Sequence, residues 1–451
     1  MAKTFRPYEP DQLLMLPPSL QEWLPTDHEV YFLSDVVNSL DLSKIYATYA
    51  EERGYPPYHP LLMVKLWLYG QMRGIRSSRK LERATLEDVP FRVLCAGNEP
   101  DHRTLSDFRR RHLDALGGLF VQVLQLCRES GLVKLGHVAI DSTKVRANAS
   151  KHKAMSYARM QEEEARLRAE VERMFAESDA IDAEEDARYG PDRRGDELPP
   201  ELAHRKRRLE KIREAKAALE RQAEEAARES GEETAPPDPK TQYSFTDPES
   251  RIMPDSNKAF IQGYSAQLAV DAEQQVIIAT NVVQATNDKQ QLVPMVEASV
   301  DSFDEVPAVF SADAGYWSDA NMEQLEAYGI EAVVAPEKIG HREWREAQPP
   351  RGRIPAGLTR KERMRRKLRT KRGRAEYDKR KVTAEPVCGQ LKDVQGIRQF
   401  LLRGLDKVQG EWLLACTGHN LLKLFRATQR RARRTPRSRT RASARFRLAP
   451  A

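Results

Sequence analysis

Between residues 152 and 235 the sequence is dominated by Glu, Ala, Arg and Lys, as in "RLEKIREAKAALERQAEEAARES". Leu, Ile and Ala recur every three or four residues, and opposite charges lie four residues apart, a pattern that predicts a long helical hairpin or coiled coil. The segment "RYGPDRRGDELPP" (188–200) has the Pro and Gly expected of its connection. Strand-like sequence precedes and follows this run, so a sheet has to assemble across a helical insertion that carries no evident chemistry.

The flanking regions alternate strand and helix patterns. "GHVAIDSTKVRA" (136–147) predicts a strand that ends near Asp141, and "GYSAQLAVDAEQQVIIATNVVQAT" (263–286) alternates apolar and polar residues across a turn, as a hairpin does. Further helices are expected at 288–303, 318–329 (with Ser318 as N-cap) and in two segments after residue 383, and further strands at 308–313 and 330–336. This order predicts a core of the α/β class.

The region before this core reads as helical. Residues 56–130 contain apolar residues at helical spacing, with Ser77 or Ser78 as a plausible N-cap and several exposed Arg and Lys. Three short helices of this kind are compatible with a helix-turn-helix module that binds DNA, although ordinary helical domains show the same pattern.

Positive charge is concentrated in two stretches of the 451-residue chain, a length that suggests two or three domains. Residues 351–381 carry fifteen Lys and Arg against three acids, a net +12, and residues 426–447 carry ten Arg and no acid. Because the whole chain has a net +7, the remainder carries −15. Clustered cations of this density are typical of a polyanion binder, and Arg365, Arg366 and Lys367 are candidate DNA contacts. The alternative is a solvated face followed by a disordered basic tail.

Composition also excludes some classes. The N-terminal residues "MAKTFRPYEPDQLLMLPPSL" contain no apolar signal core, and no later segment approaches a membrane span, so a cytoplasmic protein is expected. The four cysteines form no CxxC pair and the nine histidines show no zinc spacing. A structural zinc is therefore not predicted.

Three acids share a structural logic. Asp141 and Asp313 each end a predicted strand, and Glu385 opens a predicted helix with Pro386 in its first turn. Tips of neighbouring parallel strands converge, and a helix packed beside that edge can add a third acid. Carboxylates without His or Cys favour Mg²⁺ or Mn²⁺, and two such ions about 4 Å apart can promote phosphodiester cleavage.

Each acid also has a simpler interpretation. Asp141 could cap a turn, Asp313 could form an Asx turn, and Glu385 could be a first-turn glutamate facing the helix dipole. Asp288, in "ATNDKQQL", is interpreted as the N-cap of its helix rather than as a metal ligand.

The surroundings of Glu385 add cations. In "YDKRKVTAEPVCGQLK", Lys392 follows Glu385 by seven residues and so shares its helix face. Tyr377 and Arg380 precede it and could hold the backbone of the same DNA strand. A charged helix with a coincidental lysine is the alternative.

Taken in order along the chain, several segments resemble the DDE transposases of bacterial insertion sequences. They are "YHPLLMVKLWLYGQMRGIRSSRKLE", "TLSDFRRRH", "AIDSTKVRANAS", "FTDPESRIM", "QGYSAQLAVD", "SADAGYWS", "YDKRKVTAEPVCGQLK" and "RGLDKVQGEWLLACTGHNLLKL". The resemblance implies an RNase H-like core of mixed sheet whose catalytic triad falls on Asp141, Asp313 and Glu385.

The family's Tyr-Arg-Glu-Lys signature would fall on Tyr377, Arg380, Glu385 and Lys392. Four residues lie between Arg380 and Glu385 where the commonest form has three, and Lys381 stands at the usual spacing, so either cation could fill the position.

The expected organisation is an N-terminal helical DNA-binding domain (1–132), a catalytic core (133–151 and 240–425), a helical insertion (152–239) and a basic disordered tail (426–451). The expected function is Mg²⁺- or Mn²⁺-dependent cleavage at the terminal inverted repeats of an element and transfer of its 3′-OH to target DNA. A homodimer or higher oligomer would bring the two ends together, in association with a bacterial nucleoid. The alternative is a DNA-binding protein derived from a transposase that has lost its activity.

Overall fold

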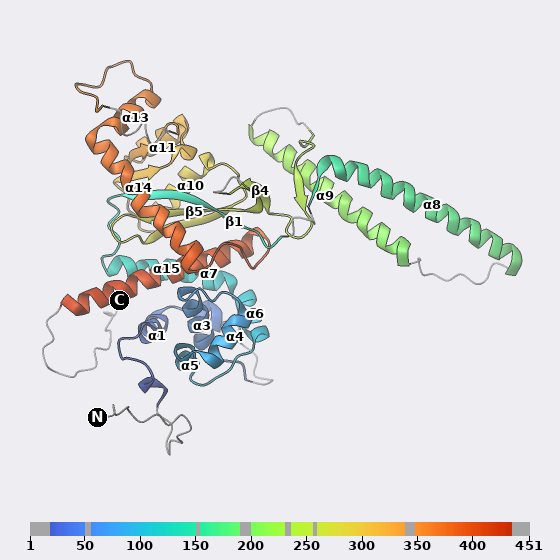
Figure 1. Ribbon diagram of the computed structural model, residues 1–451, viewed down its shortest axis with the longest axis horizontal. Helices are drawn as coiled ribbons and strands as arrows, with labels where there is room; N and C mark the ends of the chain where they lie inside the picture. Colours follow the sequence, from blue (N-terminus) through green and yellow to red (C-terminus); the bar gives the residue numbers. More distant parts are fainter. Residues whose placement is uncertain are drawn as a thin grey trace, which may run out of the picture.

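A computed structural model describes residues 19–49, 56–149, 154–189, 200–230, 236–255, 259–338 and 348–434. Within these residues the chain is a mixed α/β protein, with a helical N-terminal region below a mixed sheet and a long helical hairpin to one side (Figure 1).

The N-terminal region is helical, as predicted. After a 3₁₀ turn (Leu20–Glu22) come α1 (Glu29–Ser39), α2 (Ser43–Tyr46), α3 (Pro60–Met72), α4 (Ser78–Glu87), α5 (Val89–Cys95), α6 (His102–Arg111) and α7 (Leu113–Glu129). Helix α3 is buried over most of its length because it is apolar on nearly every face. Ser77 occupies the N-cap position of α4, although its hydroxyl makes no capping bond.

One mixed sheet forms the centre of the α/β region. Its strands are β1 (Val138–Arg146), β4 (Arg251–Pro254), β5 (Phe260–Asp271), β6 (Ile277–Val283), β7 (Val309–Ala312) and β8 (Glu331–Val334). The order is β4-β5-β1-β7-β8, and β6 also pairs with β5. Strand β1 is antiparallel to β5 and parallel to β7, and β7 is parallel to β8. The predicted hairpin is confirmed as β5 and β6.

Strand β1 corrects the prediction that the first strand ends near Asp141. It continues to Arg146, because β5 pairs with it over its whole length, from Val138 opposite Asp271 to Arg146 opposite Gly263. Only its parallel pairing with β7 stops early, at Ala139 and Ser311. Asp141 therefore lies in the middle of a strand, just beyond the point where the parallel neighbour ends.

The helices around the sheet were predicted only in part. A 3₁₀ turn (Lys289–Gln291) leads into α10 (Leu292–Asp301), a second one (Ala314–Tyr316) precedes α11 (Asp319–Ala327), and α13 (Arg360–Arg369) leads into α14 (Lys371–Gly389). Of these helices, α10 and α11 were predicted, whereas α13 and the first part of α14 lie in the basic stretch, where no helix was predicted. The Ser318 hydroxyl accepts a hydrogen bond from Asn321 N, which confirms it as the N-cap of α11. Helix α14 packs across β1, β5, β7 and β8 and ends in a π-helical turn (Gln390–Val394).

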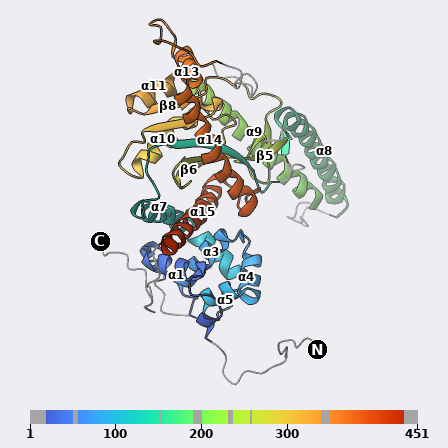
Figure 2. The same cartoon turned by 60° about the vertical axis from the view of Figure 1, so that its left-hand side comes forward.

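The last helix, α15 (Leu405–Arg434), joins the two regions. It packs on α7, α3 and β6, and it lies between the sheet and the N-terminal helices (Figures 1 and 2). A single hydrophobic cluster continues from α1 and α3 through α7 and α15 into the sheet. Because α15 runs to Arg434, the first part of the expected disordered tail is helical; the rest of that tail, from residue 435, lies outside the described residues.

The insertion is the predicted helical hairpin. Helices α8 (Tyr157–Tyr189) and α9 (Pro200–Ser230) pack on each other and extend away from the sheet (Figure 1). A short antiparallel pair, β2 (Ala154–Ser156) and β3 (Gln242–Ser244), closes their base, and this pair was not predicted. A small hydrophobic cluster that includes Met160, Leu167, Ile212 and Leu219 is separate from the main core. Most of the predicted connection, residues 190–199, lies outside the described part of the chain.

None of the helices described here combines the length and the apolar character that crossing a membrane would require.

Candidate active site

Asp141 and Asp313 lie on neighbouring strands. The parallel register pairs Ala139 with Ser311, and continuing it by two residues puts Asp141 level with Asp313. The Asp141 carboxylate accepts a hydrogen bond from Ser142 N at 2.9 Å. Asp313 directly follows β7 and caps the 3₁₀ turn after it, because its Oδ1 accepts from Gly315 N at 2.8 Å. Asp313 thus does form the Asx turn of the simpler interpretation. The same turn also holds its carboxylate beside β1.

Glu385 comes from α14, and its position there corrects the prediction. It lies near the C-terminal end of the helix, not in the first turn, so a favourable interaction with the N-terminal dipole does not explain it. Pro386 is therefore inside the helix, where it cannot donate to the Val382 carbonyl. The Gln275 side chain compensates by donating to that carbonyl at 2.7 Å. The hairpin between β5 and β6 thus stabilises the helix next to Glu385.

Arg380 connects two of the three acids, Asp141 and Glu385. Its guanidinium lies 3.8 Å from Asp141 Oδ2 and 3.1 Å from Glu385 Oε1, and its centre is 5.6 Å from the centroid of the Tyr377 ring. Lys381 instead pairs with Asp378 at 3.3 Å. Of the two cations that the sequence left open, Arg380 is the one that the structure places at the acids.

The electrostatics of Asp141 reflect a crowded, buried site. Burial raises the pKa of Asp141 to about 6, Arg380 opposes this rise, and the nearby carboxylates of Asp313 and Glu385 add to it. Burial also raises the pKa of the Tyr377 hydroxyl. The negative charge on these acids is therefore only partly compensated by the one guanidinium.

The donor set fits a hard divalent cation. All three acids offer oxygen atoms, which are the ligands that Mg²⁺ and Mn²⁺ prefer, and the carboxylates of Asp313 and Glu385 lie near enough to Asp141 to add to the rise in its pKa. As they stand, no three His, Cys, Asp or Glu side chains within the described residues are grouped closely enough to hold a metal ion. Arg380, which bridges Asp141 and Glu385, neutralises the acids instead.

Lys392 lies in the π-helical turn that follows α14, so the straight helix face expected from a spacing of seven residues is distorted there. Burial lowers its pKa, and the neighbouring Cys388 raises it in part. Burial raises the pKa of the Cys388 thiol, and the nearby charge of Asp141 adds to this rise. No hydrogen bond or ion pair engages the Lys392 ammonium among the residues that the structure describes.

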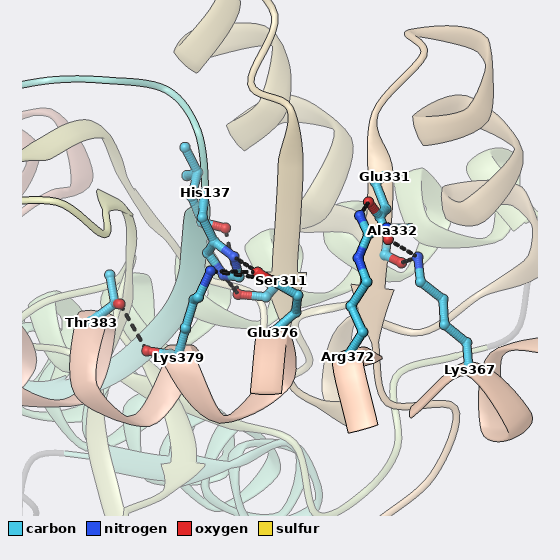
Figure 3. Close-up of polar contacts among 10 residues, drawn as sticks. His137, Ser311, Glu331, Ala332, Lys367, Arg372, Glu376, Lys379 and Thr383 are labelled. Carbon is cyan, nitrogen blue, oxygen red and sulfur yellow. Dashed lines mark hydrogen bonds and ion pairs between the residues drawn. The ribbon is translucent and has the colours of Figure 1, made fainter. Parts of the chain in front are cut away.

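The predicted DNA contacts in the basic stretch have intramolecular partners. Arg365 pairs with Glu337 at 2.5 Å, Lys367 lies 3.0 Å from Glu331, and Arg366 donates to three backbone carbonyls of residues 351–353. Figure 3 shows Lys367 and Arg372 converging on Glu331 and its neighbour Ala332. These cations hold α13 and α14 against β8, and their contact with DNA stays a prediction.

A buried histidine that sequence reasoning missed connects the strands to α14. His137, directly before β1, lies 2.8 Å from Ser311 Oγ on β7 and 2.9 Å from Glu376 on α14 (Figure 3). Burial lowers the pKa of His137, and the hydrogen bond to Glu376 opposes this shift. A lone histidine before a strand gives no sequence signal for such partners, because both lie more than a hundred residues away.

Asp288 corrects another prediction. It occupies the N-cap position of the 3₁₀ turn before α10, but its carboxylate makes no capping bond. Instead it accepts hydrogen bonds from Ser142, Lys144 and Gln267, all on β1 and β5. The available signal was Gln267, an uncharged polar side chain in the middle of a strand that is buried on both faces and therefore needs a hydrogen-bonding partner.

Comparison with known proteins agrees with the family resemblance seen in the sequence. Residues 18–111 match the family "Transposase domain (DUF772)", and residues 235–421 match the family "Transposase DDE domain". The chain thus belongs to the DDE-type transposases of insertion sequences. No curated protein gives a significant match. A solved structure titled "Crystal structure of a pre-cleavage Mos1 transpososome" is 10% identical over 90% of this chain and 98% of that chain, but its TM-score of 0.18 is too low to bear on the fold.

Proposed function

We propose that this protein binds the terminal inverted repeats of an insertion sequence, hydrolyses the phosphodiester at each element end, and transfers the released 3′-OH to target DNA. The observation that carries the proposal is the proximity of Asp141 to Asp313 and, through Arg380, to Glu385. Two neighbouring parallel strands bring the aspartates level, and α14 adds the glutamate through Arg380. Membership of the DDE-type transposases supports the same chemistry.

In this proposal Asp141 and Asp313 hold Mg²⁺ or Mn²⁺, and Glu385 completes the set. The bound ions would supply Lewis-acid stabilisation of the attacking and leaving oxygens. Arg380 already lies between two of the carboxylates, so it is placed to contact a phosphate oxygen as the acids change partners. Lys392, with Tyr377, would orient the same strand of the DNA backbone.

The architecture supports an RNase H-like core, because an antiparallel β5–β1 pair adjoins the parallel strands β7 and β8. We assign the core to residues 133–151 and 240–425, and the recognition of inverted repeats to the helices of residues 1–132. The packing of α8 on α9 supports a coiled-coil reading of the insertion (152–239). Pairing of two element ends requires a homodimer or a higher oligomer, acting in the cytoplasm at the nucleoid.

A second function, DNA binding without catalysis, is favoured by one observation. The ion pairs of Arg380 with Asp141 and Glu385 already neutralise part of the negative charge of the acidic site. Such internal neutralisation is expected in a protein that no longer binds a metal ion there. The two functions predict the same DNA binding and differ only in cleavage.

The experiment is cleavage of an inverted-repeat DNA in Mg²⁺, with a gel-shift on the same DNA. Asp313→Asn keeps the size and the hydrogen-bond acceptor, so we expect the folded protein to bind DNA as well as wild type or better and to lose cleavage. Asp319→Asn is the matched control, because this exposed residue is close in sequence but belongs to α11.

If Asp313→Asn cleaves at nearly the wild-type rate while Asp141→Asn and Glu385→Gln do not, Asp313 is only a turn residue. If wild type binds the DNA but cleaves it in neither Mg²⁺ nor Mn²⁺, the protein is the non-catalytic alternative.

A further inference from the structure

Asp288 is the centre of a polar cluster beside the proposed catalytic acids. Its Oδ2 accepts from Ser142 Oγ at 3.0 Å, and its Oδ1 accepts from Lys144 Nζ at 3.2 Å and from Gln267 Nε2 at 2.8 Å. Ser265 Oγ lies 3.4 Å from the same Oδ1. The Asp288 and Lys144 side chains are only 16% and 14% exposed, so water screens this charge pair weakly.

The cluster approaches β1 from the face opposite α14. Successive side chains of a strand point to opposite faces, so Ser142 and Lys144 share one face while Asp141, which contacts Arg380, points to the other. The backbone N–H of Ser142 nevertheless donates to Asp141 Oδ1 at 2.9 Å. Ser142 thus joins the Asp288 carboxylate to the Asp141 carboxylate with its two donors.

A second branch of the cluster reaches the turn that carries Asp313. The Tyr316 hydroxyl, at the end of that turn, donates to Gln267 Oε1, whose amide nitrogen donates to Asp288. The Asn321 amide then bridges the Tyr316 carbonyl at 2.8 Å and the Lys289 carbonyl, next to Asp288, at 2.7 Å.

Gly315 separates the two carboxylates. A Cβ atom placed on it would lie 3.0 Å from Asp313 Oδ1 and 3.8 Å from Asp288 Oδ2. Asp288 is therefore connected through short, mostly buried contacts both to β1, which carries Asp141, and to the turn that carries Asp313.

Asp288 is poorly suited to be a metal ligand itself. Both of its oxygens accept hydrogen bonds from protein donors, and the ammonium group of Lys144 neutralises its charge. Asp141 and Glu385 are less fully neutralised than Asp288, because their two carboxylates share one guanidinium, that of Arg380.

We propose that Asp288 is a positioning residue that fixes Asp141, through Ser142, and Asp313, through Gln267 and Tyr316, at the separation that the reaction requires. This inference rests on the proposed function. Removing such a support shifts the acids relative to each other, and a misplacement of about 1 Å can cost about 100-fold in rate.

Two substitutions separate support from ligation. Asp288→Asn can still accept from Lys144 and Gln267 and can donate to Ser142 Oγ, so the hydrogen-bonded cluster survives. Asp288→Ala removes the carboxylate that accepts the hydrogen bonds of the cluster. We expect single-turnover cleavage to fall about 100-fold in Asp288→Ala and less than about tenfold in Asp288→Asn, with unchanged DNA binding in both.

Mn²⁺ binding, measured by calorimetry without DNA, gives a second readout. We expect Asp288→Asn to bind Mn²⁺ as wild type does and Asp288→Ala to bind it more weakly. Asp301→Asn, an exposed acid at the other end of α10, is the matched control and should change neither quantity.

Ser142→Ala tests the route to Asp141 and covers the case in which Asp288→Ala does not fold. We expect Ser142→Ala to melt as wild type does and to cleave more slowly, and its effect should not add to that of Asp288→Ala, because both break one connection.

Wild-type cleavage rates in Asp288→Ala or Ser142→Ala would overturn the proposal. So would equal losses of cleavage and Mn²⁺ binding in Asp288→Asn and Asp288→Ala, since Asp288 would then be a ligand. If wild type itself does not cleave, the proposed function fails, and the Mn²⁺ comparison still decides whether Asp288 supports the acids.

Discussion

The buried ion pair between Arg76 and Glu411 provides a quantitative test of how the N-terminal helices are joined to the rest of the protein. Arg76, in the turn between α3 and α4, lies 2.6 Å from Glu411 on α15 and donates to the carbonyls of Gly396 and Gln399 at 2.6 and 2.7 Å. Glu411 also accepts from the backbone N–H groups of residues 401 and 402. The two side chains are 7% and 4% exposed.

Glu411→Gln leaves the Arg76 guanidinium buried without an anion, and Arg76→Met leaves the carboxylate without its cation. Breaking a buried pair in this way costs about 3–5 kcal/mol of the free energy of unfolding. The double variant removes both charges of the pair, so it should be no less stable than either single variant. The coupling energy should therefore be at least about 3 kcal/mol.

The assay is denaturant unfolding of the four proteins, followed by tryptophan fluorescence and circular dichroism. As a control, Glu87→Gln removes the exposed pair with Arg83 and should leave the unfolding midpoint unchanged. A cost below about 1 kcal/mol for Glu411→Gln would refute the argument, because the charge would then be solvated in the folded state. The argument would also be refuted if the destabilisations of the two single variants simply added in the double variant, because the coupling energy would then be zero.

Three further predictions concern DNA binding, the insertion and pH. The basic stretch contains three exposed cations with no partner among the described residues, Arg363, Arg369 and Lys371. Neutralising them should weaken binding to every DNA sequence alike. It should also flatten the slope of log K against log salt, measured by fluorescence anisotropy, by about one unit per lost phosphate contact. Replacing residues 152–239 with a short flexible linker should leave metal-dependent nicking of a bound end measurable in gel assays, since the hairpin has its own hydrophobic cluster. Burial lowers the pKa of His419 from its ordinary value near 6.5 to about 3, so the contribution of this residue to stability should be full above pH 6.5 and about 2 kcal/mol smaller at pH 5. Denaturant unfolding of wild type and His419→Gln at both pH values measures this contribution as their difference.

Each of these predictions can fail separately. An unchanged salt slope would remove the basic stretch from the DNA interface. Complete loss of nicking by a folded, DNA-bound deletion protein would assign a catalytic role to the insertion. If the stability of wild type and of His419→Gln changes by the same amount between pH 7 and pH 5, the imidazole is hydrated in the folded state.

Local sequence patterns determined the elements of this protein. The alternation of residues 263–286 predicted the hairpin, the heptad-like run predicted α8 and α9, and Ser318 marked the start of α11. These features depend on side chains a few residues apart, so the sequence alone reveals them. The same local logic selected Asp141 and Asp313, which each lie beside apolar strand sequence.

Partners distant in the sequence were decided only by the tertiary structure. Pairing with β5 carries β1 well past Asp141, and contacts with Asp141 and Glu385 distinguish Arg380 from Lys381, its equally charged neighbour. A charge pattern shows that a cation is present but not which acid will neutralise it.

The sequence determined where charge and most of the strands and helices lie along this chain, and the tertiary structure decided which charges are already neutralised. Lys367, predicted to contact DNA, pairs with Glu331 on β8, and Asp288, predicted to cap a helix, pairs with Lys144 on β1. The physical reason is that ion pairs and buried hydrogen bonds depend on distance and exclusion of water, and only the packing of the sheet against its helices sets both.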